Sequence, residues 1–114
     1  MSEVFYKNGV VQINDERHRQ ITLEGYNDEH DEKHKDGELA FAAIAYICFY
    51  GAHTYMDYTA DEALEEALEF WPWESDDPND LMKPEEDPIR NLVKAGALIA
   101  AEIDRLLKIK GQTE

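Results

Sequence analysis

The chain has 114 residues, which predicts a single domain over residues 1–114, and its 43% apolar content argues against global disorder. Twenty-six Asp and Glu against eleven Lys and Arg give a net charge of −15, so direct binding to nucleic acid is not expected. No signal peptide or membrane span is recognised and the single Cys48 excludes an internal disulfide, so we expect a cytoplasmic protein with no membrane contact.

Residues 1–13 are predicted to form a short N-terminal β-hairpin, with a frayed arm as the alternative. Apolar residues flank the dipeptide Asn8-Gly9, which is typical of a type I′ turn. Asn14 suits the N-cap of a first helix over about residues 15–24. Gly25 then ends that helix.

The longest apolar run, GELAFAAIAYICFYG, spans residues 37–51. Between its two glycines only Glu38 is charged, whereas a surface helix would show polar residues at every third or fourth position. The run therefore predicts a central helix over about residues 38–50 that is buried on most sides. It is too short for a bilayer, which needs roughly 20 residues.

A third helix is predicted over residues 61–69, capped by Thr59 or Asp61, and an acidic, proline-containing loop follows over residues 74–87. The last helix starts near Pro88. Its apolar residues recur at spacings of four and three and form a heptad seam: Leu92, Gly96, Ile99, Ile103 and Leu106. We expect this helix to pack on the central one, or the seam to serve a homodimer. The predicted fold is thus mainly α, with three or four helices around the central helix.

The segment before the central helix holds the strongest candidate for a metal site. His30 and His34 lie one helical turn apart, and Glu38 lies one turn further on. Imidazoles with flanking carboxylates can bind a transition metal, although the spacing differs from HExxH. The alternative is a solvated acidic segment in which the histidines pair with carboxylates.

Seven other side chains are candidates for ligand binding. The cations would form an anion pocket if they converge, or else form salt bridges with the many acids. The two tryptophans flank Pro72 and would either cover a ligand or pack in the core. We expect the polar residues near the first helix and the start of the central helix to converge, as a ligand site or as a structural cluster. The candidates are Arg17, Arg19, Glu24, Trp71, Trp73, Arg90 and Lys94.

Two stretches resemble the MazG-like all-α nucleoside triphosphate pyrophosphohydrolases. HKDGELAFAA, residues 34–43, is similar to the family's EExGELxEA pattern, and LVKAGALI, residues 92–99, to its later ELGD-containing helix. The resemblance implies that acidic helices hold magnesium, which grips a nucleotide's phosphates. Glu38 matches the acid of GEL. The family's other acids are replaced here by His34, Lys35, Lys94 and Ala97.

The chain also resembles small uncharacterised proteins encoded by phages and prophages, on the segments ERHRQITLEGY, EHDEKH, GELA, WPW, KP and LVKAGALIAAEIDRL. This resemblance implies an accessory role and names no reaction. We therefore expect a binding module without catalysis that binds a host protein or sequesters a small, nucleotide-like ligand. The alternative is a nucleotide pyrophosphohydrolase with an altered MazG-like site that uses Mg²⁺ or another divalent metal.

Overall fold

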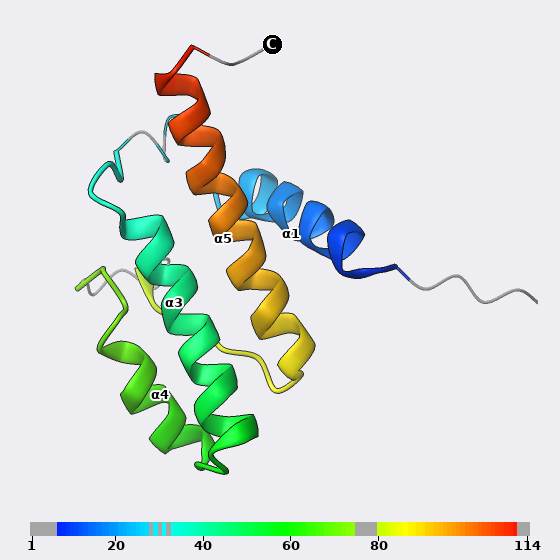
Figure 1. Ribbon diagram of the computed structural model, residues 1–114, viewed down its shortest axis with the longest axis vertical. Helices are drawn as coiled ribbons and strands as arrows, with labels where there is room; N and C mark the ends of the chain where they lie inside the picture. Colours follow the sequence, from blue (N-terminus) through cyan, green and yellow to red (C-terminus); the bar gives the residue numbers. More distant parts are fainter. Residues whose placement is uncertain (1–6, 28, 30, 32, 75–79, 112–114) are drawn as a thin grey trace, which may run out of the picture.

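The computed structural model describes residues 7–27, 29, 31, 33–74 and 80–111, and the fold of these residues is mainly helical. The helices are α1 (Gly9–Leu23), α3 (Glu38–Tyr50), α4 (Ala60–Leu68) and α5 (Pro88–Ile109), and the π-helical turn η1 (Gly51–Tyr55) continues α3. In Figure 1, α3 and α5 run side by side in opposite directions, with α4 beside α3 and α1 against α5. None of the described helices combines the length and apolar character needed to cross a membrane.

The N-terminal segment differs from the prediction, because residues 9–13 belong to α1 and not to a hairpin. Asn8 caps this helix, since its side chain accepts a hydrogen bond from the backbone N–H of Val11 at 3.0 Å. The helix therefore starts at Gly9, and Asn14 lies inside it. Residues 1–6, which include the first predicted strand, are outside the described residues.

Helix α1 is fixed to α5 by a close contact between Ile13 and Gly96. A Cβ atom placed on Gly96 would lie 2.5 Å from Cδ1 of Ile13, so a larger residue at this position would require the Ile13 side chain to shift. The contact explains why a segment with the local pattern of a hairpin becomes helical, since the helix brings an apolar side chain onto α5.

Helix α3 covers the residues for which the apolar run predicted a helix, and it begins after Gly37, whose φ of 86° is in the left-handed region. Two of its sides are covered by other helices. Toward α5 the buried contact consists of Leu39, Ala42, Ala43, Tyr46, Ala95, Leu98 and Ala101, and toward α4 of Ala45, Phe49, Ala63 and Ala67. The small residues allow a close approach of the helices.

The prediction of an enclosed central helix is not confirmed, because the third side of α3 reaches the surface. Phe41, Ile44 and Ile47 are exposed on this side. The heptad seam of α5 does not pack on α3 either. Since α5 uses Leu98 and its alanine neighbours for that contact, Ile99 and the rest of the seam point elsewhere.

The ends of α4 and α5 follow from their local sequence. Thr59 caps α4 in a reciprocal arrangement with Glu62, in which each side chain accepts a hydrogen bond from the other residue's backbone N–H. Asp87 caps α5 by accepting from the N–H of Ile89 at 3.0 Å, and Pro88 occupies the first turn. Both starts lie within one or two residues of the predicted ones.

Candidate functional site

The predicted cations meet a carboxylate of the chain itself at the junction of α1 and α5. Glu16 is 2% exposed. Arg19 donates to both of its carboxylate oxygens, at 2.9 and 2.8 Å, and Arg90 donates to one of them. Arg19 also donates to Glu24 at 2.8 Å. Two of the predicted anion-binding arginines are therefore already paired with a buried anion, which corresponds to the salt-bridge alternative.

The protonation of Glu16 reflects this pairing. Burial alone would raise the pKa of its carboxyl group, but the hydrogen bonds from Arg19 and Arg90 outweigh burial and hold the pKa below its ordinary value. The carboxylate is therefore ionised at neutral pH, and a buried charge with two cationic donors fixes α1 on α5.

Lys94 fixes the loop before α5 in a similar way. Its Nζ donates to the carbonyl oxygen of Lys83 at 2.7 Å, forms an ion pair with Glu85 at 2.7 Å and lies 5.6 Å from the ring centroid of Tyr46. The hydroxyl of Tyr46 accepts a hydrogen bond from the N–H of Lys83 at 3.0 Å. The loop residues after position 80 are thus attached to both α3 and α5.

A small cavity lies between the cluster around Glu16 and the contacts of Lys94. It measures about 20 Å³, and its lining includes Glu24, Tyr26, Trp71 and Lys94. The side-chain oxygen of Gln20 belongs to the same lining and has no hydrogen-bond partner among the described residues. This volume is close to that of one water molecule, so the cavity as it stands has no room for a nucleotide.

The tryptophans are partly buried and pack against the core. The indole N–H of Trp71 donates to the carbonyl oxygen of Asp80 at 2.8 Å, and its ring lies edge-on to Tyr46, with centroids 5.8 Å apart. Trp73 meets Trp71 edge-on at 5.0 Å and His34 at 5.1 Å. These contacts correspond to the packing alternative considered for the pair.

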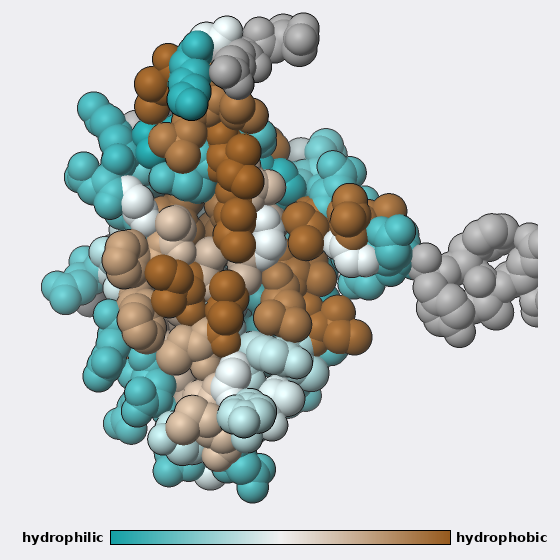
Figure 2. Space-filling model, in the orientation of Figure 1, coloured by the Kyte–Doolittle hydropathy of each residue, from teal (hydrophilic) through white to brown (hydrophobic). Residues whose placement is uncertain are grey.

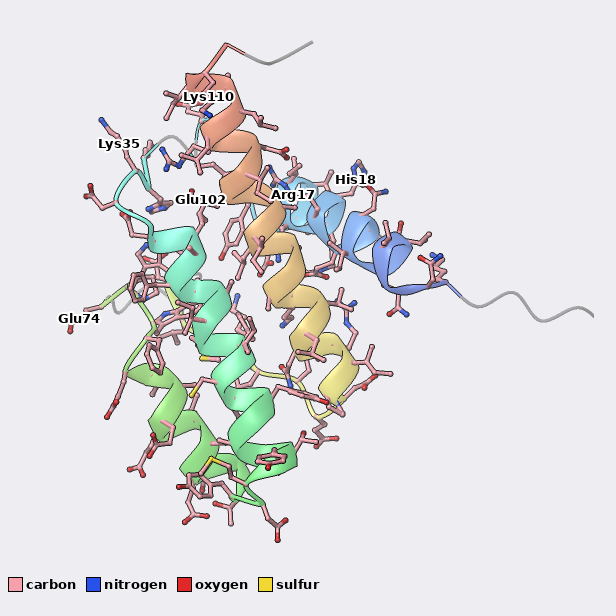
Figure 3. All side chains as sticks on the ribbon, viewed as in Figure 1. Arg17, His18, Lys35, Glu74, Glu102 and Lys110 are labelled. Atoms are coloured by element: carbon pink, nitrogen blue, oxygen red, sulfur yellow. The ribbon has the colours of Figure 1, made fainter. Side chains whose placement is uncertain are left out.

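Arg17 lies apart from the cluster of Arg19 and Glu24. Its guanidinium donates to the carbonyl oxygen of Tyr26 at 3.0 Å and to Asp31 at 3.2 Å, and it approaches Asp104 at 3.7 Å. Figure 3 shows Arg17 where α1 meets α5. The polar residues expected to converge that the structure describes are thus distributed over separate groups: Arg19 with Glu24, Arg17 with Asp31, and His34 with Glu38.

The predicted metal site is described only in part. His34 Nδ1 lies 3.4 Å from Glu38, whose other oxygen accepts from the N–H of Asp36 at 2.7 Å. Burial acts to raise the pKa of Glu38, but the backbone amides and His34 outweigh it and lower the pKa. His30 lies outside the described residues. Among those that are described, no three His, Cys, Asp or Glu side chains are grouped as metal ligands, and the three-residue site stays a prediction.

Of the positions that carry the resemblance to the MazG-like family, Lys94 and Glu38 do not lie side by side. Lys94 lies against Tyr46, eight residues after Glu38 on α3, which corresponds to about 12 Å along the helix. The hydrogen bond from Arg105 to Glu102 is the main cause of the raised pKa of the Arg105 guanidinium. Glu38 lies near enough to add to this effect.

The most distinctive surface of the molecule is apolar. Its α3 residues were predicted to be buried, and its α5 residues to pack on the central helix or to serve a homodimer. We name it the apolar ridge. Its large side chains come from α3 and α5 and are each 39% to 50% exposed: Phe41, Ile44, Ile47, Leu92, Ile99, Ile103 and Leu106. In Figure 2 the brown of hydrophobic residues gathers over these two helices, with teal at the margins. The heptad spacing was the signal for this face, but it does not say what covers it.

Comparisons with known proteins add no relative. No family description matches the chain, and neither curated proteins nor solved structures give a match.

Proposed function

We propose that this protein is a binding module without catalysis, and that it acts by docking another protein on the apolar ridge. The exposure of seven large apolar side chains on adjoining faces of α3 and α5 carries this proposal. A helix buries its apolar stripe against another layer in a stable domain, and this face of the helix pair meets no further layer among the described residues.

The size of the ridge supports a protein partner. A large side chain offers about 200 Å² when fully exposed, so seven of them at 39% to 50% exposure offer roughly 600 Å². Monomeric proteins rarely expose a larger contiguous apolar patch, since their largest patch is typically about 300–600 Å². The ridge is therefore at the upper end of this range, where such patches are often functional.

The arrangement of charges also favours protein binding over sequestration of a small ligand. Binding pockets for small molecules usually measure about 300–1,000 Å³, whereas the cavity beside Lys94 measures about 20 Å³. Glu16 and Glu85 already neutralise the cations that would otherwise grip a phosphate. Holding the helices together therefore accounts for the charged groups of this junction without a bound ligand.

The partner is expected to present an apolar helical surface. Carboxylates are dense around the rest of the molecule, which carries a net charge of −15, so the contact is expected to centre on the apolar ridge. A host protein is the natural candidate if the chain serves a phage, as its resemblance to phage-encoded proteins implies.

Site-specific photo-crosslinking in cells tests this proposal. A benzoylphenylalanine placed at Ile99 should form covalent adducts with protein, because this position is at the middle of the ridge. The matched control is Leu68 on α4, which is 47% exposed where Ile99 is 42% exposed. The control should form few adducts.

Two results would contradict the proposal. One is equal crosslinking, or none, at the two positions. The other is turnover of a nucleoside triphosphate by the purified protein with Mg²⁺ or Mn²⁺ that is lost in Glu38→Gln, which would favour the pyrophosphohydrolase.

A further inference from the structure

We infer that the apolar ridge is covered by a second copy of this chain, with the two α5 helices packed antiparallel about a two-fold axis near Ile99. This inference rests on the proposed function, since it names the partner of the same surface. Three properties of the ridge and its margins lead to it: charge, symmetry and area.

Charge restricts where two copies of so acidic a chain can meet. The solvent face of α4 presents Glu62, Glu65, Glu66 and Glu69, so contact there would oppose carboxylates. The ridge has no such obstacle. No Asp, Glu, Lys or Arg occurs over residues 39–55 of α3 and η1 or over residues 95–101 of α5. At the centre of the ridge two copies can pack without burying charge.

The heptad seam has the symmetry of an isologous contact. Leu92 and Leu106 lie seven residues on either side of Ile99. In an antiparallel pair centred on Ile99, each leucine therefore meets the other leucine of the second copy, and Ile99 meets its own counterpart. The same rotation places α3 over α3 of the second copy. The two helix pairs then form two layers of a four-helix arrangement, with both apolar faces inside.

The ends of α5 carry opposite charges, and this fixes the direction of packing. Glu86 and Asp87 are exposed at its start, and Lys108 and Lys110 are exposed at its end. Figure 3 places Lys110 at the end of α5 away from α4. Antiparallel packing brings the acids of one copy near the lysines of the other, whereas parallel packing would oppose like charges. The exposed Asp104 has a cation of its own chain, Arg17, at 3.7 Å.

The area available matches that of a stable dimer. The seven ridge side chains offer roughly 600 Å² per copy, and the flanking Ile89 and Ile109, exposed by 55% and 70%, extend the surface along α5. A standard interface buries about 800 Å² per partner. Face-to-face contact along α3 and α5 reaches this size.

Sedimentation equilibrium over a wide concentration range tests whether the second copy binds. The wild-type chain should approach twice its mass of 13.2 kDa. Ile99→Glu places two carboxylates at the axis and should weaken association by more than about 30-fold. Leu68→Glu is the matched control and should leave the mass unchanged. Circular dichroism melts of both variants confirm that they fold.

Cysteine pairs test the direction of packing. Leu92→Cys and Leu106→Cys should not form disulfide dimers when each is oxidised alone, but a mixture of the two should, because position 92 faces 106 only in the antiparallel pair. The oxidised wild-type chain controls for Cys48. Dimers from Leu92→Cys alone would overturn the antiparallel arrangement.

A monomeric wild-type chain at every concentration would overturn the inference. If adducts with other proteins still formed at Ile99 and not at Leu68 in that case, the proposed function would stand without the second copy. Loss of both the dimer and the adducts would reject the two proposals together.

Discussion

The inner junction of α1 and α5 and the outer face of α3 and α5 have opposite characters. The junction contains a buried Glu16 with two arginines and a nearby Lys94 with its own carboxylate, and all five charges are paired. The apolar ridge consists of large hydrophobic side chains that are half exposed. Polar residues here hold the fold together, while apolar residues remain available for a partner. The following predictions test this division, from the largest expected effect to the smallest.

Leu39→Ala should produce the largest loss of stability. Leu39 is fully buried between α3 and α5, and such a truncation typically costs about 2–5 kcal/mol in the free energy of unfolding. The matched change on the ridge is Ile47→Ala, which should cost less than about 1 kcal/mol. Urea denaturation measures both in an Ile99→Glu background, so that association does not contribute. Equal losses would mean that the ridge is core after all.

Glu16→Gln should lower the free energy of unfolding by about 1–3 kcal/mol, because it removes the carboxylate that Arg19 and Arg90 share and leaves Arg19 with Glu24 alone. The mutant keeps the shape of the side chain and should retain the mass of the wild type. Asp15→Asn removes an exposed ion pair with Lys7 and serves as the control, with an expected change within about 0.5 kcal/mol. A stable Glu16→Gln chain would show that the cluster is not structural.

The contribution of Glu16 should also depend on pH. Because its folded pKa is lowered, the stabilisation is fully present above its ordinary pKa of about 4.5 and is lost as the pH falls through the lower folded value. The difference in stability between wild type and Glu16→Gln should therefore narrow below about pH 4.5. Protonation of the other carboxylates relieves charge repulsion in both proteins, so this effect cancels in the difference between them. A difference that widens at low pH would contradict the assignment.

Lys94→Met should have the smallest effect, about 1 kcal/mol, since Glu85 can return to water when its partner is lost. The loop before α5 should loosen, because the carbonyl oxygen of Lys83 loses a donor. Hydrogen exchange of the backbone amide of Lys83, which donates to Tyr46, reports this change directly. An unchanged exchange rate at the Lys83 amide would show that Lys94 does not hold the loop in place.

The helices near Glu38, Thr59 and Pro88 were predictable because local signals decide them: an apolar run after a glycine, a capping residue and a proline in the first turn. The N-terminal segment was not. Asn8-Gly9 is typical of a hairpin turn and Asn8 is also a good N-cap, and the contact of Ile13 with Gly96 across the fold favours the helix.

The sequence indicated that Arg19 and Arg90 could converge, but it did not identify the carboxylate that they share. The sequence contains 26 acidic residues, and nothing local distinguishes Glu16 as the one that Arg19 and Arg90 share. Helical periodicity likewise identified the heptad seam but not what covers it, because the spacing of Leu92, Ile99 and Leu106 is the same for a contact within the chain and for a contact with a partner. His30 lies outside the described residues, so the metal site is still a prediction.

The most direct test of the division between junction and ridge is a side-by-side measurement of mass and stability for wild type, Glu16→Gln and Ile99→Glu. Sedimentation equilibrium and urea denaturation at the same concentrations provide both quantities. We predict that wild type and Glu16→Gln are dimers, with the mutant less stable, and that Ile99→Glu is a folded monomer of 13.2 kDa. A dimeric Ile99→Glu chain, or a Glu16→Gln chain that loses association and keeps its stability, would contradict the account.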